Sequence, residues 1–343
     1  MSIRVIRSGL LTTVQDLGRF GFQKDGVTVG GAMDQFAHRI ANILVGNEES
    51  EGTLEMTFIG PTLAFEEDAL VAICGGEFEV SIDGQEVPLW RPVFVKQGSI
   101  LTIGHCRAGC RAYLAVSGGF HIPKIMNSQS TYLLARIGGF QGRALQKDDV
   151  LLLRESRRKF ELLRLHKKKT SLPFITMSWG ISFPFRAYFY KSPKTIRVIQ
   201  GAQFAHFTTQ SQKRFFTQPY KVTSQSNRMG YRLEGPLLKR KHSVEMVSEA
   251  VTFGTIQVPN EGKPIILMAD RQTTGGYPKI AQVIAVDLPI LAQTKLGEQI
   301  VFRDISFEEA QRLYVQHEFA LNQCKKVIVA KMGDESVSSR SQL

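Results

Sequence analysis

The sequence predicts a mainly β protein made of two barrel-like domains with a few short helices. Its 343 residues are enough for two domains of about 100–200 residues each. Short strand-like runs, punctuated by the chain's 30 glycines, recur along most of the sequence. Helical periodicity is rare, and this combination favours barrels or sandwiches over an α/β sheet.

The first domain is predicted over residues 1–153. Glu77–Ile82 alternate, turn at Asp83-Gly84 and return through Gln85–Trp90. Asp-Gly between two such runs indicates a hairpin, because both central residues of a type I′ turn need positive φ. A helix is predicted at Asp34–Val45, with its first residue as the cap. Further strands are predicted at Ala69–Ile73, Ser99–Ile103, Ala112–Val116 and Val150–Leu153.

A basic connecting segment, residues 154–194, follows the first domain. Residues 153–169 hold eight Lys and Arg against two acids, which supplies half of the net charge of +12. The second domain is predicted over 195–325. Its expected elements are strands at 195–199, 252–258 and 264–268, a short helix from Asp287, and a helix at about 307–322 that begins with a capping box of Ser306 and Glu309. Residues 326–343 are predicted to be a tail, polar from Asp334 onward.

The composition argues against several classes of protein. No stretch approaches the ~18 consecutive apolar residues of a membrane span, and the N-terminus lacks a signal-peptide pattern. We therefore expect a cytoplasmic protein with no membrane partner. The basic charge lacks a helix-turn-helix, zinc-finger or RNA-binding signature, so no nucleic acid is expected. Such a surface can instead attract an anionic substrate or an acidic partner.

No metal site is predicted. The chain has four cysteines, too few and too scattered for a disulfide framework. His105, Cys106 and Cys110 lie close together, but no second pair completes a zinc-ribbon pattern. No P-loop, G-x-S-x-G elbow or H-E-x-x-H is present. Ala330-Lys331-Met332 lacks the preceding methionine of a biotin acceptor, so no covalent biotin is expected.

The segment Ala269–Pro278 is the first candidate site. Asp270, Gln272, Thr273 and Tyr277 stand beside a Gly-Gly turn directly after an apolar strand. These side chains offer acceptors and hydroxyls, and the glycines expose backbone N–H groups to an anion or carbonyl. The alternative is a tight turn whose Asp and Thr side chains bond to their own backbone.

Two further segments are rich in polar residues. Asn227, Arg228 and Arg232 surround a glycine, and two guanidinium groups can hold a carboxylate or phosphate. The alternative is that these arginines lie on a surface loop and bind no ligand. The third group is Gln15, Asp16 and Arg19, which either bind substrate or tie the N-terminus to the first barrel. The residues alone thus predict an Arg-rich polar cleft but no particular substrate.

These segments resemble the carboxyltransferase family, also called allophanate hydrolase subunit 2. The resemblance covers nearly the whole chain up to about residue 303. It is carried by GLLTTVQDLGRFGF (9–22), GGAMDQFAHRIANILVGN (30–47), LEMTFIGPTLAF (54–65), SGGFHIP (117–123), NRMGYRLEG (227–235) and the run from SEAVTFG to PILAQ (248–293). It implies that both domains are cyclophilin-like β-barrels.

Within that family, a free-standing chain of this length resembles the C subunits of bacterial 5-oxoprolinases. The resemblance implies a hydrolase active only in complex, which cleaves 5-oxo-L-proline to L-glutamate with ATP. Its partners would be a Kip-type B subunit, which is similar to a kinase inhibitor, and a third protein, the A subunit. ATP is expected at an interface with the B subunit, accompanied by Mg²⁺. Arg228 and Arg232 would then bind the substrate carboxylate or phosphates, while Asp270, Gln272, Thr273 and Tyr277 would line the lactam site.

Two alternatives remain at this point. One is a regulatory protein that binds and antagonises a histidine-kinase inhibitor, the homologue of the B subunit. The other is a carboxyltransferase that acts with a biotin protein in trans. One departure from the family pattern concerns Gln129, which stands where an arginine is frequent, so no charge-clamping role is assigned there.

Overall fold

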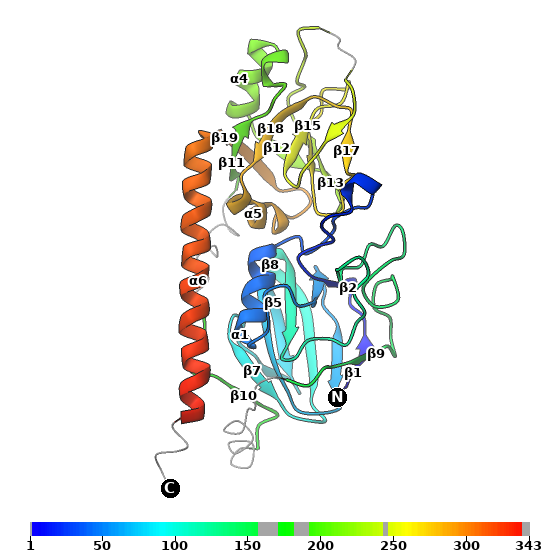
Figure 1. The fold of residues 1–343 in the computed structure, drawn as a ribbon, viewed down its shortest axis with the longest axis vertical. Helices are drawn as coiled ribbons and strands as arrows, with labels where there is room; N and C mark the ends of the chain where they lie inside the picture. Colours follow the sequence, from blue (N-terminus) through cyan, green and yellow to red (C-terminus); the bar gives the residue numbers. More distant parts are fainter. Residues whose placement is uncertain (1, 157–170, 182–191, 243–245, 338–343) are drawn as a thin grey trace. The chain divides into compact units, whose positions relative to one another are not determined.

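The computed structural model describes residues 2–156, 171–181, 192–242 and 246–337. The chain divides into two compact units (Figure 1). The first comprises Met1–Gly18, Asp34–Pro184 and Phe319–Leu343, and the second comprises Arg19–Met33 and Phe185–Glu318. Within the described residues, no helix combines the length and the apolar composition needed to cross a membrane.

The first unit contains a ten-stranded sheet. Its strands are β1 (Ser2–Arg7), β2 (Leu11–Gln15), β3 (Thr53–Thr57), β4 (Thr62–Phe65), β5 (Ala69–Ile82), β6 (Gln85–Glu86), β7 (Pro92–Val95), β8 (Ile100–Val116), β9 (Val150–Leu152) and β10 (Phe174–Thr176). The main path runs β10-β7-β5-β8-β4-β1-β9, and β3 joins β2 to β8. The long β8 pairs with β4 near its start and with β3 near its end. β10 pairs with β7, so part of the predicted linker 154–194 belongs to this sheet.

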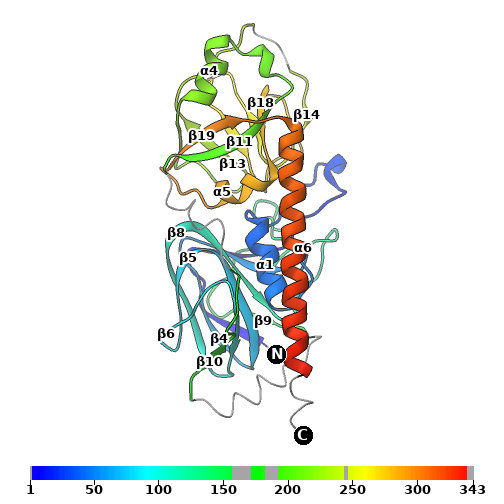
Figure 2. The same cartoon turned by 90° about the vertical axis from the view of Figure 1, so that its left-hand side faces the viewer.

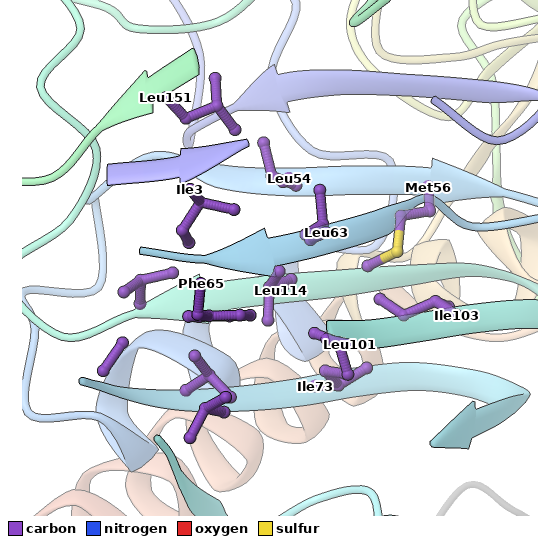
Figure 3. Packing of buried hydrophobic residues seen from close by; sticks show 14 of the residues in the cluster. Ile3, Leu54, Met56, Leu63, Phe65, Ile73, Leu101, Ile103, Leu114 and Leu151 are labelled. Carbon is purple, nitrogen blue, oxygen red and sulfur yellow. The ribbon is translucent and has the colours of Figure 1, made fainter. Parts of the chain in front are cut away.

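The predicted hairpin and helix of the first unit are confirmed. Asp83 and Gly84 have φ of 48° and 81°, as the turn between β5 and β6 requires. Helix α1 covers Gln35–Leu44, and the side chain of its cap, Asp34, accepts a hydrogen bond from the Ala37 N–H at 2.9 Å. The helix packs against β5 and β8. On the sheet, alternate apolar residues such as Leu54, Leu63, Phe65 and Leu114 form the core (Figure 3).

The second unit contains a closed seven-stranded barrel, which confirms the mainly β prediction. Its order is β11-β18-β15-β16-β13-β12-β19. The barrel strands are β11 (Lys194–Gln200), β12 (Tyr220–Val222), β13 (Gly230–Glu234), β15 (Thr255–Gln257), β16 (Ile265–Leu267), β18 (Lys279–Val283) and β19 (Gln299–Asp304). Parallel pairing of β11 with β19 closes it (Figure 2). The remaining elements are η1 (Gln23–Asp25), η2 (Phe204–His206), α4 (Thr209–Thr217), η3 (Ala285–Asp287), α5 (Leu288–Ala292) and a pair of short strands, β14 (Glu249–Ala250) and β17 (Thr274–Gly275).

Helix α6, Phe307–Val337, is longer than the predicted helix at about 307–322. It continues because Leu321 and Ile328 are seven residues apart and both are buried, which extends one apolar face. Of the predicted capping box only half forms, since Ser306 accepts from the Glu309 N–H while the Glu309 carboxylate binds Arg312. Residues 157–170 and 182–191 of the predicted connecting segment and residues 338–343 of the predicted tail lie outside the described residues.

Candidate functional site

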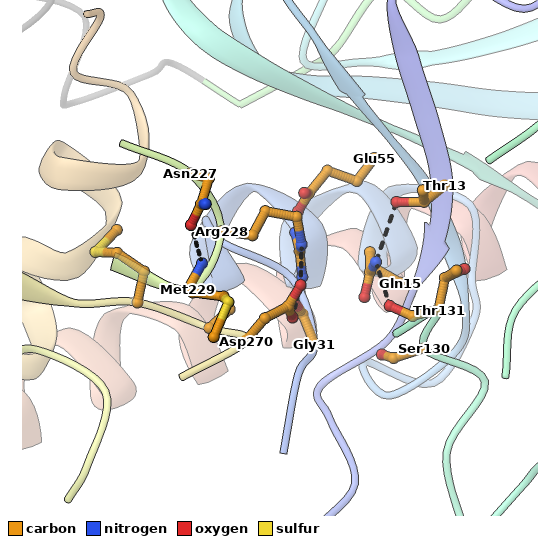
Figure 4. Close-up of polar contacts among 12 residues, drawn as sticks. Thr13, Gln15, Gly31, Glu55, Ser130, Thr131, Asn227, Arg228, Met229 and Asp270 are labelled. Atoms are coloured by element: carbon orange, nitrogen blue, oxygen red, sulfur yellow. Dashed lines mark hydrogen bonds and ion pairs between the residues drawn. The ribbon is translucent and has the colours of Figure 1, made fainter. Parts of the chain in front are cut away.

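Arg228 and Asp270, predicted separately, bind one another in the second unit. Arg228 Nε donates to Asp270 Oδ2 at 2.8 Å, and Nη2 donates to Oδ1 at 3.0 Å (Figure 4). The same Nη2 also donates to the Gly31 carbonyl at 2.6 Å. Both side chains are buried, with 7% and 5% of their residue surfaces exposed. Because both Asp270 oxygens accept from the guanidinium, the pair anchors the start of the 269–278 loop.

The neighbouring turn explains why Arg228 points inward. Asn227 Oδ1 accepts from the Met229 N–H at 2.8 Å, which closes an Asx-type turn before β13. Arg228 is buried within this turn. Arg232 lies on β13, where Tyr231 and Leu233 face the core and its own side chain is exposed. The two arginines therefore differ in environment, and only Arg228 takes part in the buried pair with Asp270.

The loop after Asp270 is held by its backbone and leaves several side chains available. The Thr273 carbonyl accepts from the Val251 N–H at 3.1 Å, and Thr274–Gly275 forms β17 against β14. The buried Gln257 donates to the Tyr277 carbonyl at 3.2 Å. Within the described part of the chain, the side chains of Gln272, Thr273 and Tyr277 form no hydrogen bond. The alternative, in which the Asp and Thr side chains of this turn bond to their own backbone, is therefore not what holds this loop.

Arg271 belongs to this loop and was not singled out from the sequence. Its side chain is half-buried, and its guanidinium carbon lies 5.9 Å from the centre of the Phe253 ring. Burial lowers the pKa of Arg271 to about 10, against the opposing attraction of Asp270. The group is still charged at neutral pH. The sequence shows an arginine in a polar loop, but only the structure shows that it is half-buried.

Gln15 and Asp16 lie in the first unit and form a network with the 128–131 segment. Asp16 Oδ1 accepts from Ser128 Oγ at 2.8 Å and Ser130 Oγ at 2.5 Å, and Oδ2 accepts from the Gln129 N–H at 2.6 Å. These contacts link the end of strand β2 to a distant segment of the chain. This is the arrangement expected if Gln15 and Asp16 tie the N-terminus to the first domain. Asp16 has no oxygen left without a donor.

Gln15 completes this network. Its Nε2 donates to Thr13 Oγ1 at 3.0 Å and to the Thr131 carbonyl at 3.1 Å (Figure 4), and its buried Oε1 has no hydrogen-bond partner. Arg19, predicted with them, is assigned to the second unit and is fully buried. Gln129, the departure from the family pattern, uses its amide to bond the Gly52 N–H and the Ile122 carbonyl.

A buried polar face on β2, β3 and β8 was also missed from the sequence. Glu55 lies opposite Thr13 on one side and Tyr113 on the other. The Tyr113 hydroxyl donates to Glu55 Oε2 at 2.8 Å and accepts from the Asp34 N–H at 2.7 Å. Burial, together with the nearby Glu55 carboxylate, raises the pKa of Tyr113. The alternation of Thr53, Glu55 and Thr57 in one strand is the pattern that could have indicated this face.

No metal-binding group is evident in the described part of the chain. Nowhere in it do three or more His, Cys, Asp or Glu side chains gather closely enough to hold an ion. The site is therefore a loop of neutral donors and acceptors, flanked by one buried ion pair and one half-buried arginine. Such a set suits a small polar molecule better than a metal.

Comparisons with known proteins agree with this architecture. The carboxyltransferase domain family, subdomain A and B, matches residues 25–304. The chain is 39% identical over 320 residues to the 5-oxoprolinase C subunit of Haemophilus influenzae, covering 93% of this chain and 96% of that protein. It is 41% identical over 308 residues to the 5-oxoprolinase C subunit of Escherichia coli, covering 90% and 93%.

A solved structure has a similar fold. The crystal structure of K. lactis urea amidolyase superposes with a TM-score of 0.81 at 28% identity, and the match covers 94% of this chain but 20% of that one. Residues 227–277, which include the loop site, lie inside the family match, whereas Gln15, Asp16 and Arg19 precede it. The chain belongs to the carboxyltransferase domain family.

Proposed function

We propose that this chain is the C subunit of an ATP-dependent 5-oxoprolinase, which opens 5-oxo-L-proline to L-glutamate together with its A and B subunits. The observation that carries the proposal is identity of 39% and 41% to two proteins that are named as C subunits of 5-oxoprolinase, over at least 90% of every chain compared. Relatives that match end to end share their domain organisation as well as their sequence.

The 269–278 loop supports a lactam substrate. A lactam ring presents one carbonyl acceptor and one N–H donor, and the amide of Gln272 with the hydroxyls of Thr273 and Tyr277 can serve both. Tyr277 is 47% exposed, so part of this residue is accessible to a ligand. Asp270, whose carboxylate is bound by Arg228, would act by holding the loop in place.

ATP would supply the phosphoryl group that activates the lactam oxygen, since a resonance-stabilised amide resists attack by water. This chain offers no P-loop and, in its described residues, no acidic cluster for Mg²⁺. These two observations support a nucleotide site that another subunit helps to form. We propose that ATP and Mg²⁺ bind at an interface that the B subunit helps to form.

The decisive experiment is reconstitution. Glutamate release from 5-oxo-L-proline is measured with the purified A and B subunits, with and without this chain, in the presence and absence of ATP. We expect ATP-dependent release only when all three proteins are present. Equal release without the chain would instead support the regulatory function, in which the chain binds the B subunit without taking part in turnover.

The fold shared with urea amidolyase supports a second candidate, carboxyl transfer from a biotin protein in trans. A biotin blot of the complex isolated from cells, together with urea-dependent ATP hydrolysis by that complex, tests this candidate. A biotinylated partner and urea-dependent turnover would favour carboxyl transfer over lactam hydrolysis.

A further inference from the structure

The guanidinium of Arg271 lacks a counter-ion in the described part of the chain. Its Nη1 reaches the carbonyls of Met268 and Ala269, both at 3.4 Å, near the limit of a hydrogen bond. Its Nε is buried and has no hydrogen-bond partner. The side chain thus carries a positive charge and an unused donor in a partly desolvated position.

Among the described residues, two other half-buried arginines are each paired with a carboxylate, whereas the half-buried Arg91 reaches only the Met177 carbonyl at 3.4 Å. Arg197 binds Asp287 through two hydrogen bonds at 3.0 and 2.5 Å, and Arg143 binds Asp149 through two at 2.7 Å. Burying a charge without a partner costs free energy that pairing offsets. Arg271 carries this cost, because no carboxylate among the described residues forms an ion pair with it.

The adjacent carboxylate does not fill this role in the structure. Asp270 precedes Arg271 directly, but both of its oxygens accept hydrogen bonds from Arg228. The residues that follow, Gln272 and Thr273, are neutral, as is Tyr277. The loop therefore offers one cationic donor next to neutral hydrogen-bonding groups, which matches a small monoanion that also carries an amide.

We propose that Arg271 binds the carboxylate of the lactam substrate, while the neutral side chains of the loop contact its ring amide. This inference rests on the proposed function and adds to it the residue that selects an anionic substrate. It also gives a reason for specificity, because a neutral amide such as urea would leave the guanidinium unpaired.

The test uses the reconstituted complex of all three proteins carrying Arg271→Gln or Arg271→Lys. Loss of a charge-assisted hydrogen bond should raise KM for 5-oxo-L-proline by about 10–100-fold in Arg271→Gln, with a much smaller change in kcat. Arg271→Lys, which keeps the charge, should recover part of that loss. The inhibition constant of 2-pyrrolidinone, the same lactam without the carboxylate, should be the same for Arg271→Gln and wild type.

Arg214→Gln is the matched control, since Arg214 is an exposed arginine of α4 in the same unit. An unchanged KM for 5-oxo-L-proline in a folded Arg271→Gln complex would overturn the inference. So would a rise in KM for ATP alone, which would assign the guanidinium to a phosphate. A wild-type complex without activity would refute the proposed function instead, so the two failures are distinguishable.

Discussion

At the scale of single residues, the Arg228–Asp270 pair determines how the 269–278 loop begins. Removing one partner of a buried pair leaves an uncompensated charge and costs about 3–5 kcal/mol. We expect Asp270→Asn, which keeps the shape but not the charge, to lower the free energy of unfolding by about 3 kcal/mol in urea titrations. The double variant Arg228→Met/Asp270→Leu, which removes both charges, should lose less. Equal losses in the two variants would contradict this account.

A second residue-scale prediction concerns His38, which is buried beside Thr53 with 2.9 Å between Nδ1 and Oγ1. Burial lowers the pKa of His38 from 6.5 to about 4, although the charges of Asp16 and Glu55 oppose this shift. Below pH 6.5 the unfolded chain therefore takes up a proton that the folded chain does not. Stability should fall as the pH drops from 6.5 to about 4, by up to about 3 kcal/mol.

The comparison of wild type with His38→Gln isolates this contribution from that of the carboxylates. Urea midpoints are measured from about pH 7 down to about pH 4, the interval between the pKa of this histidine in the unfolded chain and its pKa in the folded chain. The variant should lose less stability than wild type over this interval, because its amide does not titrate. Parallel curves for the two proteins would show that His38 does not bind its proton as weakly as the structure indicates.

Much of the loop site could be predicted from the sequence, but its internal pairing could not. Arg228 and Asp270 were both identified, yet 42 residues separate them. They meet because β13 pairs with β16 in the register that places Gly230 opposite Leu267. Register between distant strands depends on the whole barrel, and so a local pattern shows which residues are polar but not which of them bind each other.

At the scale of elements, helix α1 provides a direct test of local sequence signals. Asp34→Ala removes the acceptor for the Ala37 N–H, and we expect a loss of about 1 kcal/mol in the free energy of unfolding. Asp34→Ser retains a capping oxygen and should stay within a few tenths of a kcal/mol of wild type. The hydrogen bond from the backbone N–H of residue 34 to the Tyr113 hydroxyl can form in all three proteins. If alanine and serine behaved alike, the cap would not be contributing.

Strand boundaries were harder to predict than the helix and the hairpin. The runs Ala69–Ile73 and Glu77–Ile82 appeared separate, but they form one strand, β5. Gly75 has a φ of 121°, and the register with β8 shifts just after it. A Cβ at this position would lie 2.4 Å from the Arg111 carbonyl oxygen. Gly75 therefore permits a bulge within a single strand. The sequence was instead interpreted as two strands with a break between them.

At the scale of the whole molecule, the described chain does not divide into two continuous domains. Arg19–Met33 belong to the second unit although they precede most of the first. Met33 is fully buried in the core of the second unit, the cluster that contains Ile196 and Phe302. A sequence pattern identifies Met33 as apolar but does not say which of two cores it joins. The prediction of a first domain over 1–153 assumed the nearer core.

This division can be tested with one pair of matched substitutions. Met33 lies in the core of the second unit and Met56 in that of the first, and both are fully buried. Each change to alanine should cost about 2–5 kcal/mol in its own unit. Both tryptophans of the chain, Trp90 and Trp179, lie in the first unit, so their fluorescence reports on that unit while far-UV circular dichroism reports on both.

We expect Met56→Ala to move the tryptophan transition in urea to lower concentration. Met33→Ala should instead broaden or split the circular dichroism transition and leave the tryptophan midpoint nearly unchanged, because each unit has its own core. Equal shifts of both signals in both variants would show that the two units unfold as one cooperative body. A tryptophan shift in Met33→Ala larger than that in Met56→Ala would contradict the assignment of Met33 to the second core.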